Sequence, residues 1–233
     1  MMTAFVTGGG KGLGKGFVDY LLDRGYVVFS GERQPQNTPQ RENLHVIPLD
    51  LSSDTSIAQS FELVSVQTDH LDFLVNNAGV NKDSATNNHK EKVTLLQDLD
   101  RESLLNMISI NTIAPLLMVK TYLPLLMKAE KSFVVNVSSC RASYHDEIPN
   151  TSANYGYRAS KTALNMMTFC SLTDLPTNIK TYAVHPGSVK TDMNPVGTDM
   201  PYDQAQKILA IAQNWKDEFN GKFLRYDGTL YPL

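Results

Sequence analysis

The sequence has few of the residues that mark specialised protein classes. Only two of its 233 residues are cysteine, so no disulfide framework can be identified. The five histidines are scattered without the spacing of metal ligands, and we therefore expect no metal site. The net charge of -3 leaves no basic excess to neutralise phosphates, which argues against a nucleic-acid partner.

Long uninterrupted apolar runs are also missing. Pro115, Lys120 and Pro124 interrupt the most apolar stretch before it reaches the length of a membrane span. The first residues contain neither the basic region nor the cleavage site of a secretory signal. We therefore expect a cytoplasmic protein without a membrane partner.

What the sequence does contain is typical of a folded α/β protein. Hydrophobic residues make up 42% of it and charged residues 19%. Short apolar runs alternate with longer segments of helical period, which predicts a parallel sheet built from βαβ units. No repeat or low-complexity linker divides the chain, so we expect a single domain over residues 1–233.

The alternation predicts a doubly wound sheet of about seven strands with helices on both faces, in three layers. The expected strands are Ala4–Val6, Val27–Ser30, Leu44–Leu49, Leu71–Val75, Phe133–Val137, Ile179–Val184 and Lys222–Tyr226. The expected helices are Gly14–Asp23, Glu102–Met127 and Tyr157–Ser171, and the expected loops are Gln34–Glu42, Asn81–Lys92, Ser143–Ala153 and Asn194–Pro201. In such sheets, ligands bind outside the carboxyl ends of the strands.

A glycine-rich loop, Gly8-x-x-x-Gly12-x-Gly14, joins the first strand to the first helix. Backbone amides at a helix N-terminus attract phosphate, and glycines allow a pyrophosphate to approach closely. The loop therefore indicates a Rossmann-type dinucleotide site, although its spacing differs from G-x-G-x-x-G. A glycine-rich turn without a ligand is the alternative interpretation.

The end of the second strand is expected to meet the adenosine ribose of the dinucleotide. Glu32 lies 20 residues after Gly12 (32 − 12), near where an acidic residue binds the ribose hydroxyls of NAD. Arg33 follows it and Lys11 lies inside the glycine loop, where both would neutralise the 2′-phosphate of NADP. Two cations against one acid favour NADP(H) slightly over NAD(H). A merely solvated Arg33 is the alternative.

Three further strand ends carry candidate cofactor contacts. Asp50 ends the third strand, where a carboxylate is able to accept a hydrogen bond from the adenine amino group. Asn76-Asn77-Ala78-Gly79 ends the fourth, and its small residues would let the backbone run beside the cofactor. Pro186-Gly187 turns the chain after the sixth strand, so that the following backbone and Thr191 would hold the nicotinamide carboxamide. A plain tight turn remains an alternative for the Asn-Asn-Ala-Gly segment.

Tyr157 and Lys161 form the strongest chemical candidate. They are four residues apart, so on a helix they share one face. A tyrosine has an unperturbed pKa of about 10, and a neighbouring ammonium group stabilises its phenolate near neutral pH. The neighbouring Tyr155 has no such partner, because residue 159 is alanine. Any Tyr-x-x-x-Lys pair also arises easily by chance.

Ser139 and Asn111 are the other candidates for the chemistry. The fifth strand ends in Ser138-Ser139, and a hydroxyl there is able to donate to a substrate carbonyl oxygen. Asn111 precedes Pro115 by four residues in a predicted helix, so its carbonyl oxygen loses its helical N–H partner. A water held there would return protons to Tyr157 through Lys161. A surface serine and a simple proline kink are the alternatives.

Together and in this order, these motifs resemble the short-chain dehydrogenase/reductase family over essentially the whole chain. The segment Asn154–Asn165 and the ending Gly221–Gly228 look like the branch of C-factor and sniffer-type carbonyl reductases. The resemblance implies a catalytic tetrad of Asn111, Ser139, Tyr157 and Lys161. The expected cofactor contacts are Gly8, Lys11, Gly12, Leu13, Gly14, Glu32, Arg33, Asp50, Leu51, Asn77, Ala78, Gly79, Tyr157, Lys161, Pro186, Gly187, Val189 and Thr191.

The family resemblance also implies an activity and an assembly. We expect hydride transfer between NAD(P)H and a carbonyl or alcohol substrate, with Tyr157 as acid and base. The long apolar helices match those that this family pairs between subunits, which predicts a homodimer or homotetramer. A cofactor-binding signalling protein with little turnover is the rival hypothesis, because C-factor is named for a signalling role.

Three departures from the family pattern concern the substrate side of the site. Ser139 and Tyr157 are 18 residues apart (157 − 139), which suggests an added polar loop beside the substrate mouth. Ala142 stands where a glycine often follows the serine pair. Ser188 replaces a tryptophan often found in this branch, which would enlarge the pocket or make it more polar.

Overall fold

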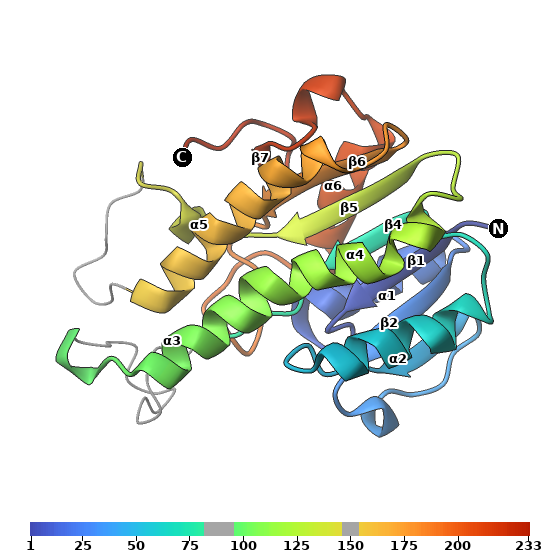
Figure 1. Cartoon of the computed structure of the whole chain (residues 1–233), viewed down its shortest axis with the longest axis horizontal. Helices are drawn as coiled ribbons and strands as arrows, with labels where there is room; N and C mark the ends of the chain where they lie inside the picture. Colours follow the sequence, from blue (N-terminus) through green and yellow to red (C-terminus); the bar gives the residue numbers. More distant parts are fainter. Residues whose placement is uncertain (82–95, 146–153) are drawn as a thin grey trace.

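The computed structural model of the chain describes residues 1–81, 96–145 and 154–233 (Figure 1). Seven parallel strands form one sheet in the order β3-β2-β1-β4-β5-β6-β7. They are β1 (Thr3–Thr7), β2 (Val27–Glu32), β3 (Leu44–Pro48), β4 (Phe73–Asn76), β5 (Ser132–Val137), β6 (Ile179–His185) and β7 (Phe223–Arg225). The predicted doubly wound sheet is confirmed, and each predicted strand lies within two residues of its observed bounds.

Helices cover both faces of the sheet. They are α1 (Gly12–Asp23), α2 (Asp54–Ser65), α3 (Arg101–Ile108), α4 (Ala114–Leu126), α5 (Tyr155–Cys170) and α6 (Pro201–Gln213). Figure 1 shows α2, α4 and α5 in front of the sheet, and α1 and α6 behind it. Short 3-10 turns lie at Pro35–Asn37, Leu96–Asp98, Cys140–Ala142, Ser171–Thr173 and Asp217–Phe219.

The two faces of the sheet bury separate apolar cores. All five residues of β1 and all six of β5 are buried, as expected for parallel strands that are covered on both sides. Phe17 of α1 and Ile208 of α6 pack into the rear core, while Met118 and Tyr122 of α4 pack into the front core. Burying one such side chain contributes about 1.5–3 kcal/mol to the free energy of folding.

The helix expected at Glu102–Met127 is confirmed as one continuous helical run over Arg101–Leu126, which consists of α3, a π-helical turn at Ser109–Ile113, and α4. Pro115 comes directly after the π-helical turn, and the helix continues through it. The expectation that Pro115, Lys120 and Pro124 keep this apolar stretch shorter than a membrane span is wrong. By length and composition alone, the run Arg101–Leu126 is able to cross a membrane, but its inner face packs on the sheet and supplies part of the front core.

Helices α2 and α6 do not follow from the motifs of the sequence. α2 begins after Ser53, whose hydroxyl oxygen accepts a hydrogen bond from the backbone N–H of Ser56 at 3.2 Å. α6 begins at Pro201, within the segment expected to be a loop, since proline suits the first helical position. Most of the expected loops Asn81–Lys92 and Ser143–Ala153 lie outside the described residues.

Candidate active site

In the glycine loop at the end of β1, the glycine positions leave no room for side chains. Gly8 and Gly12 have φ values of +69° and +54°, which favour glycine. A Cβ on Gly14 would lie 2.0 Å from the carbonyl oxygen of Gly8. The loop leads directly into α1, so it forms a cradle of bare backbone at a helix N-terminus, which fits a pyrophosphate group.

The end of β4 is tied to this cradle by Asn77. Its side-chain amide donates to the carbonyl oxygen of Thr7 at 3.0 Å, and its backbone N–H donates to the Thr7 hydroxyl at 3.0 Å. The backbone N–H of Ala78 donates to the same hydroxyl at 3.1 Å. Asn77 thus ties the end of β4 to the end of β1, and Ala78 lies against Gly8.

Glu32 is the last residue of β2, and it is buried beneath the glycine loop. Its carboxylate accepts hydrogen bonds from the Ser30 hydroxyl at 2.6 Å and from the Thr38 hydroxyl at 2.5 Å. A Cβ on Gly10 would lie 2.5 Å from the carboxylate. Both carboxylate oxygens of Glu32 therefore already accept hydrogen bonds from the protein's own hydroxyl groups.

The two cationic candidates nearby are exposed. Arg33 follows Glu32 on the surface, and its charge helps to lower the pKa of the Asp50 carboxyl, after the larger effect of hydrogen bonds from Ser52. Lys11 Nζ forms an ion pair with Asp192 at 3.0 Å, and its side chain is 79% exposed. The partner of Lys11 was not foreseen, because the two residues are far apart in the sequence.

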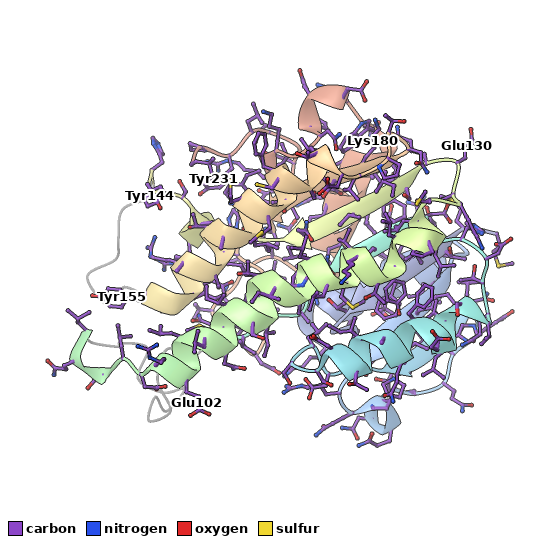
Figure 2. The ribbon with its side chains drawn as sticks, in the orientation of Figure 1. Glu102, Glu130, Tyr144, Tyr155, Lys180 and Tyr231 are labelled. Atoms are coloured by element: carbon purple, nitrogen blue, oxygen red, sulfur yellow. The ribbon has the colours of Figure 1, made fainter. Side chains whose placement is uncertain are left out.

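The carboxyl ends of β5 and β6 meet the start of α5, where the chemical candidates gather. Tyr157 lies in the first turn of α5, and Ser139 follows β5 as the N-cap of the turn Cys140–Ala142. Figure 2 shows Tyr155, at the start of α5, and Tyr144, beyond that turn, at this same end of the molecule. Ser139 Oγ accepts a hydrogen bond from the backbone N–H of Arg141 at 3.2 Å.

Tyr157 interacts with Ser139 at this end of the sheet. Burial raises the pKa of the Tyr157 hydroxyl above its usual value, while a hydrogen bond with Ser139 and the charge of Arg141 act in the opposite direction. Arg141 was not among the expected site residues. A guanidinium two residues after the candidate serine was the signal that was overlooked.

Lys161 lies one turn after Tyr157 on the same face of α5, as the four-residue spacing predicts. Its Nζ lies 5.9 Å from the centroid of the Tyr157 ring and donates to the carbonyl oxygen of Val137 at 2.8 Å. Burial lowers the pKa of Lys161 to about 8. A Cβ on Gly79 would lie 3.6 Å from this Nζ and 3.1 Å from Asn111 Oδ1, so the three residues converge.

Asn111 is fully buried in the π-helical turn, and its side chain acts as a connector. Its amide pairs with the backbone of Val80 through two hydrogen bonds of 2.8 Å. The same amide nitrogen donates to the Ser160 hydroxyl at 3.0 Å, and Ser160 donates to the carbonyl oxygen of Tyr157 at 2.8 Å. Ser160, another residue not foreseen, therefore joins Asn111 to the first turn of α5.

The Pro186–Thr191 segment completes this edge of the sheet. Gly187 adopts a φ of +85°, which confirms the turn expected after β6. A Cβ on Gly12 would lie 3.1 Å from Thr191 Cγ2, so the segment touches the glycine loop. Val189 is buried against the rear core. The structure thus brings the expected cofactor residues of β1, β4 and β6 along one continuous edge.

Comparisons with known proteins agree with this arrangement. The family model described as short chain dehydrogenase matches residues 2–200. C-signal of Myxococcus xanthus is 33% identical over 171 residues, which cover 72% of this chain and 96% of that protein. An NADPH-bound carbonyl reductase from chicken fatty liver superposes with a TM-score of 0.86 and 27% identity, covering 100% and 99% of the two chains.

The carbonyl reductase Sniffer of D. melanogaster superposes with a TM-score of 0.85 and 26% identity over 100% of both chains. The resemblance to C-factor and sniffer-type proteins is therefore confirmed. Fold, family match and relatives point the same way, and the chain belongs to the short-chain dehydrogenase family of NAD(P)(H)-dependent oxidoreductases.

Proposed function

We propose that the protein reduces a carbonyl group with NADPH, or oxidises the corresponding alcohol, with Tyr157 as the proton donor and acceptor. The observation that carries the proposal is the interaction of the half-buried Tyr157 with Ser139, with Lys161 Nζ on the next turn of the same helix face, 5.9 Å from the ring centroid of Tyr157. A tyrosine placed beside a serine and a lysine is a candidate general acid and base.

Ser139 would polarise the substrate. Since its oxygen already accepts the N–H of Arg141, its own proton is available for the substrate carbonyl oxygen or for Tyr157. Tyr157 would then give its phenolic proton to the same oxygen. The reduced nicotinamide, when bound, supplies the hydride for the carbonyl carbon. Burial raises the pKa of Tyr157, which keeps the phenol protonated and ready to donate at neutral pH.

Lys161 and Asn111 would support the proton supply. Lys161 Nζ, held by Val137, lies close enough to the tyrosine ring to stabilise a phenolate after proton donation. The Asn111 amide is occupied by Val80 and Ser160, so any part that Asn111 takes in a proton relay falls to its backbone carbonyl oxygen. Pro115 lacks the N–H that would otherwise satisfy this carbonyl in an α-helix.

We propose NADP(H) as the preferred cofactor. Glu32 is buried and accepts hydrogen bonds from Ser30 and Thr38, so it is poorly placed to accept ribose hydroxyls. Arg33 and Lys11 are exposed on the same edge and would attract a 2′-phosphate. The NADPH in the structure of the chicken carbonyl reductase agrees with this preference.

The test is the loss of reduced-nicotinamide absorbance with NADPH and NADH separately, over a panel of aldehydes, ketones and diketones. Tyr157→Phe is expected to lower kcat about 10²–10⁴-fold, the usual contribution of a positioned acid. Tyr155→Phe is the matched control, since Tyr155 is exposed and has no lysine partner. Turnover that survives Tyr157→Phe would contradict the proposal.

The rival hypothesis is a cofactor-binding regulator with little turnover, in keeping with the name of the relative C-signal. It predicts tight NADPH binding that alters a partner's affinity, with no turnover on the panel. The grouping of Tyr157 with Ser139 and Lys161 favours the enzyme, since a sensor has no need of a proton donor at this position.

We also propose that two copies associate through α3–α4 and α5. Their outer faces expose six apolar side chains, those of Leu105, Ile113, Leu116, Met166, Met167 and Phe169. Leu116 and Met167 line one shared cavity, so apolar side chains of α4 and α5 meet there. Light scattering is expected to show a dimer or tetramer that Met167→Asp dissociates; a monomeric wild type would contradict this assembly.

A further inference from the structure

The segment after the Pro186–Gly187 turn folds back on itself and meets Asp199. The backbone N–H of Lys190 donates to the carbonyl oxygen of Asp199 at 2.9 Å, and the N–H of Asp199 donates to the carbonyl oxygen of Ser188 at 3.0 Å. These two hydrogen bonds join Asp199 to Ser188 and Lys190, the residues on either side of Val189. Val189 and Asp199 therefore form a parallel β-bridge. Because backbone groups alternate along extended chain, the N–H of Val189 points away from Asp199.

The side chain of Asp199 adds a third attachment. Its Oδ2 accepts a hydrogen bond from the backbone N–H of Ser188 at 2.8 Å. A Cβ on Gly187 would lie 2.7 Å from the same oxygen, so the carboxylate packs directly on the turn. A hydrogen bond to a charged acceptor is about twice as strong as a neutral one. The carboxylate therefore holds the turn itself as well as the residues after it.

Two neighbouring residues complete this attachment. The buried Gln204 of α6 donates from Nε2 to the carbonyl oxygen of Pro186 at 2.8 Å. A Cβ on Gly197 would lie 2.4 Å from the carbonyl oxygen of Val189, so the returning chain presses closely against it. The turn is thus fixed both from α6 and from the returning chain.

We infer that Asp199 is a positioning residue, which holds the Pro186–Val189 turn in the geometry that receives the nicotinamide end of the cofactor. The inference rests on the proposed function, in which this turn and Thr191 hold the nicotinamide carboxamide. Asp199 touches no reacting atom and acts only through the turn. The adenosine half is expected to bind at the glycine loop and the ends of β2 and β3, away from Asp199, so the two halves of the cofactor will respond differently to its loss.

The test compares NADPH with 2′-phospho-ADP-ribose, which lacks the nicotinamide, by titration calorimetry. Asp199→Ala is expected to weaken NADPH binding about tenfold, as for one lost hydrogen bond to a charged group, and to leave the fragment within about twofold. Asp199→Asn keeps an acceptor oxygen and is expected to restore most of the affinity. Asp203→Ala is the matched control, an exposed carboxylate four residues further on.

A second readout follows the face of the nicotinamide from which hydride leaves. With cofactor deuterated on either face, the wild type is expected to use one face, and Asp199→Ala to lose part of this selectivity. A merely structural residue would lower the melting temperature without changing the selectivity. If Asp199→Ala does not fold, Asp199→Ser, whose shorter side chain does not reach the Ser188 N–H, takes its place.

Three outcomes would overturn the inference. Equal weakening of NADPH and the fragment would make Asp199 a general stabilising residue, and unchanged NADPH affinity and facial selectivity would leave it without a role at the turn. If wild-type protein bound the fragment and NADPH equally, the turn would hold no nicotinamide. A wild type that binds neither cofactor nor fragment would overturn the proposed function itself, which the first two outcomes leave standing.

Discussion

The ammonium group of Lys161 donates a hydrogen bond to the carbonyl oxygen of Val137 at 2.8 Å, in the buried space between α5 and the end of β5. A charged group in such a place costs free energy that one hydrogen bond offsets only in part. Consistent with this, burial lowers the pKa of Lys161 to about 8. The stability of the protein without cofactor therefore depends on pH in a definite direction.

We expect the free energy of unfolding to rise with pH between about 8 and 10. In this window the folded protein has released the Lys161 proton, while the unfolded chain, in which this lysine has its ordinary pKa of 10.5, still binds it. The fall of about 2.5 pKa units (10.5 − 8) bounds the rise at about 3 kcal/mol. The measurement is urea unfolding at several pH values below 10, above which tyrosines begin to ionise in the unfolded chain. Lys161→Met is expected to flatten the profile, and an equal slope in this variant would refute the assignment.

Arg141 is expected to tune the tyrosine. Its charge lowers the pKa of Tyr157, so Arg141→Met raises that pKa. Alcohol oxidation needs the phenolate. The rise of kcat/KM for oxidation with increasing pH should therefore move to higher pH. The measurement is kcat/KM for oxidation against pH, with Arg141→Lys as the charge-retaining control. Superimposable profiles for Met and Lys variants would remove Arg141 from the electrostatics of the site.

Arg33 and Lys11 are expected to set the cofactor preference. Replacing either with alanine should reduce the ratio of kcat/KM for NADPH to that for NADH about tenfold, mainly through the KM of NADPH, because a charge-assisted contact to the 2′-phosphate is lost. The preference should also fall with added salt, since both side chains are exposed. Lys15→Ala, an exposed cation on α1, is the control. An unchanged ratio in both variants would show that these two cations do not set the preference between NADPH and NADH, and would leave Glu32 as the residue that does.

Gly14 is expected to tolerate no side chain. In Gly14→Ala the new Cβ would lie 2.0 Å from the carbonyl oxygen of Gly8, so the glycine loop must shift. Overpacking of this kind costs about 1–3 kcal/mol, and the shifted loop should also lose NADPH affinity. Gly25→Ala is the comparison, since its Cβ meets nothing within 4 Å and only its φ of +77° is strained. Thermal unfolding and cofactor titration measure both effects, and normal binding by Gly14→Ala would show that the loop is not a tight cradle.

Short-range patterns in the sequence carried most of the fold and the principal residues of the candidate site. Strand positions, the glycine loop and the shared face of Tyr157 and Lys161 depend on spacing within one element or between neighbours in the chain. The π-helical turn at Asn111 and the helices α2 and α6 did not follow from such patterns. Their formation depends on packing against a sheet whose strands are distant in sequence.

The amino-acid sequence by itself determined which groups are present and where each lies along its strand or helix, because backbone periodicity and glycine geometry are local properties. Only the tertiary structure decided which distant groups meet. The tertiary structure places the Thr38 hydroxyl where it donates a hydrogen bond to the Glu32 carboxylate. It also pairs Lys11 with Asp192 and brings Asp199 to the turn after β6. Such contacts depend on how whole elements pack, and no spacing along the chain encodes them.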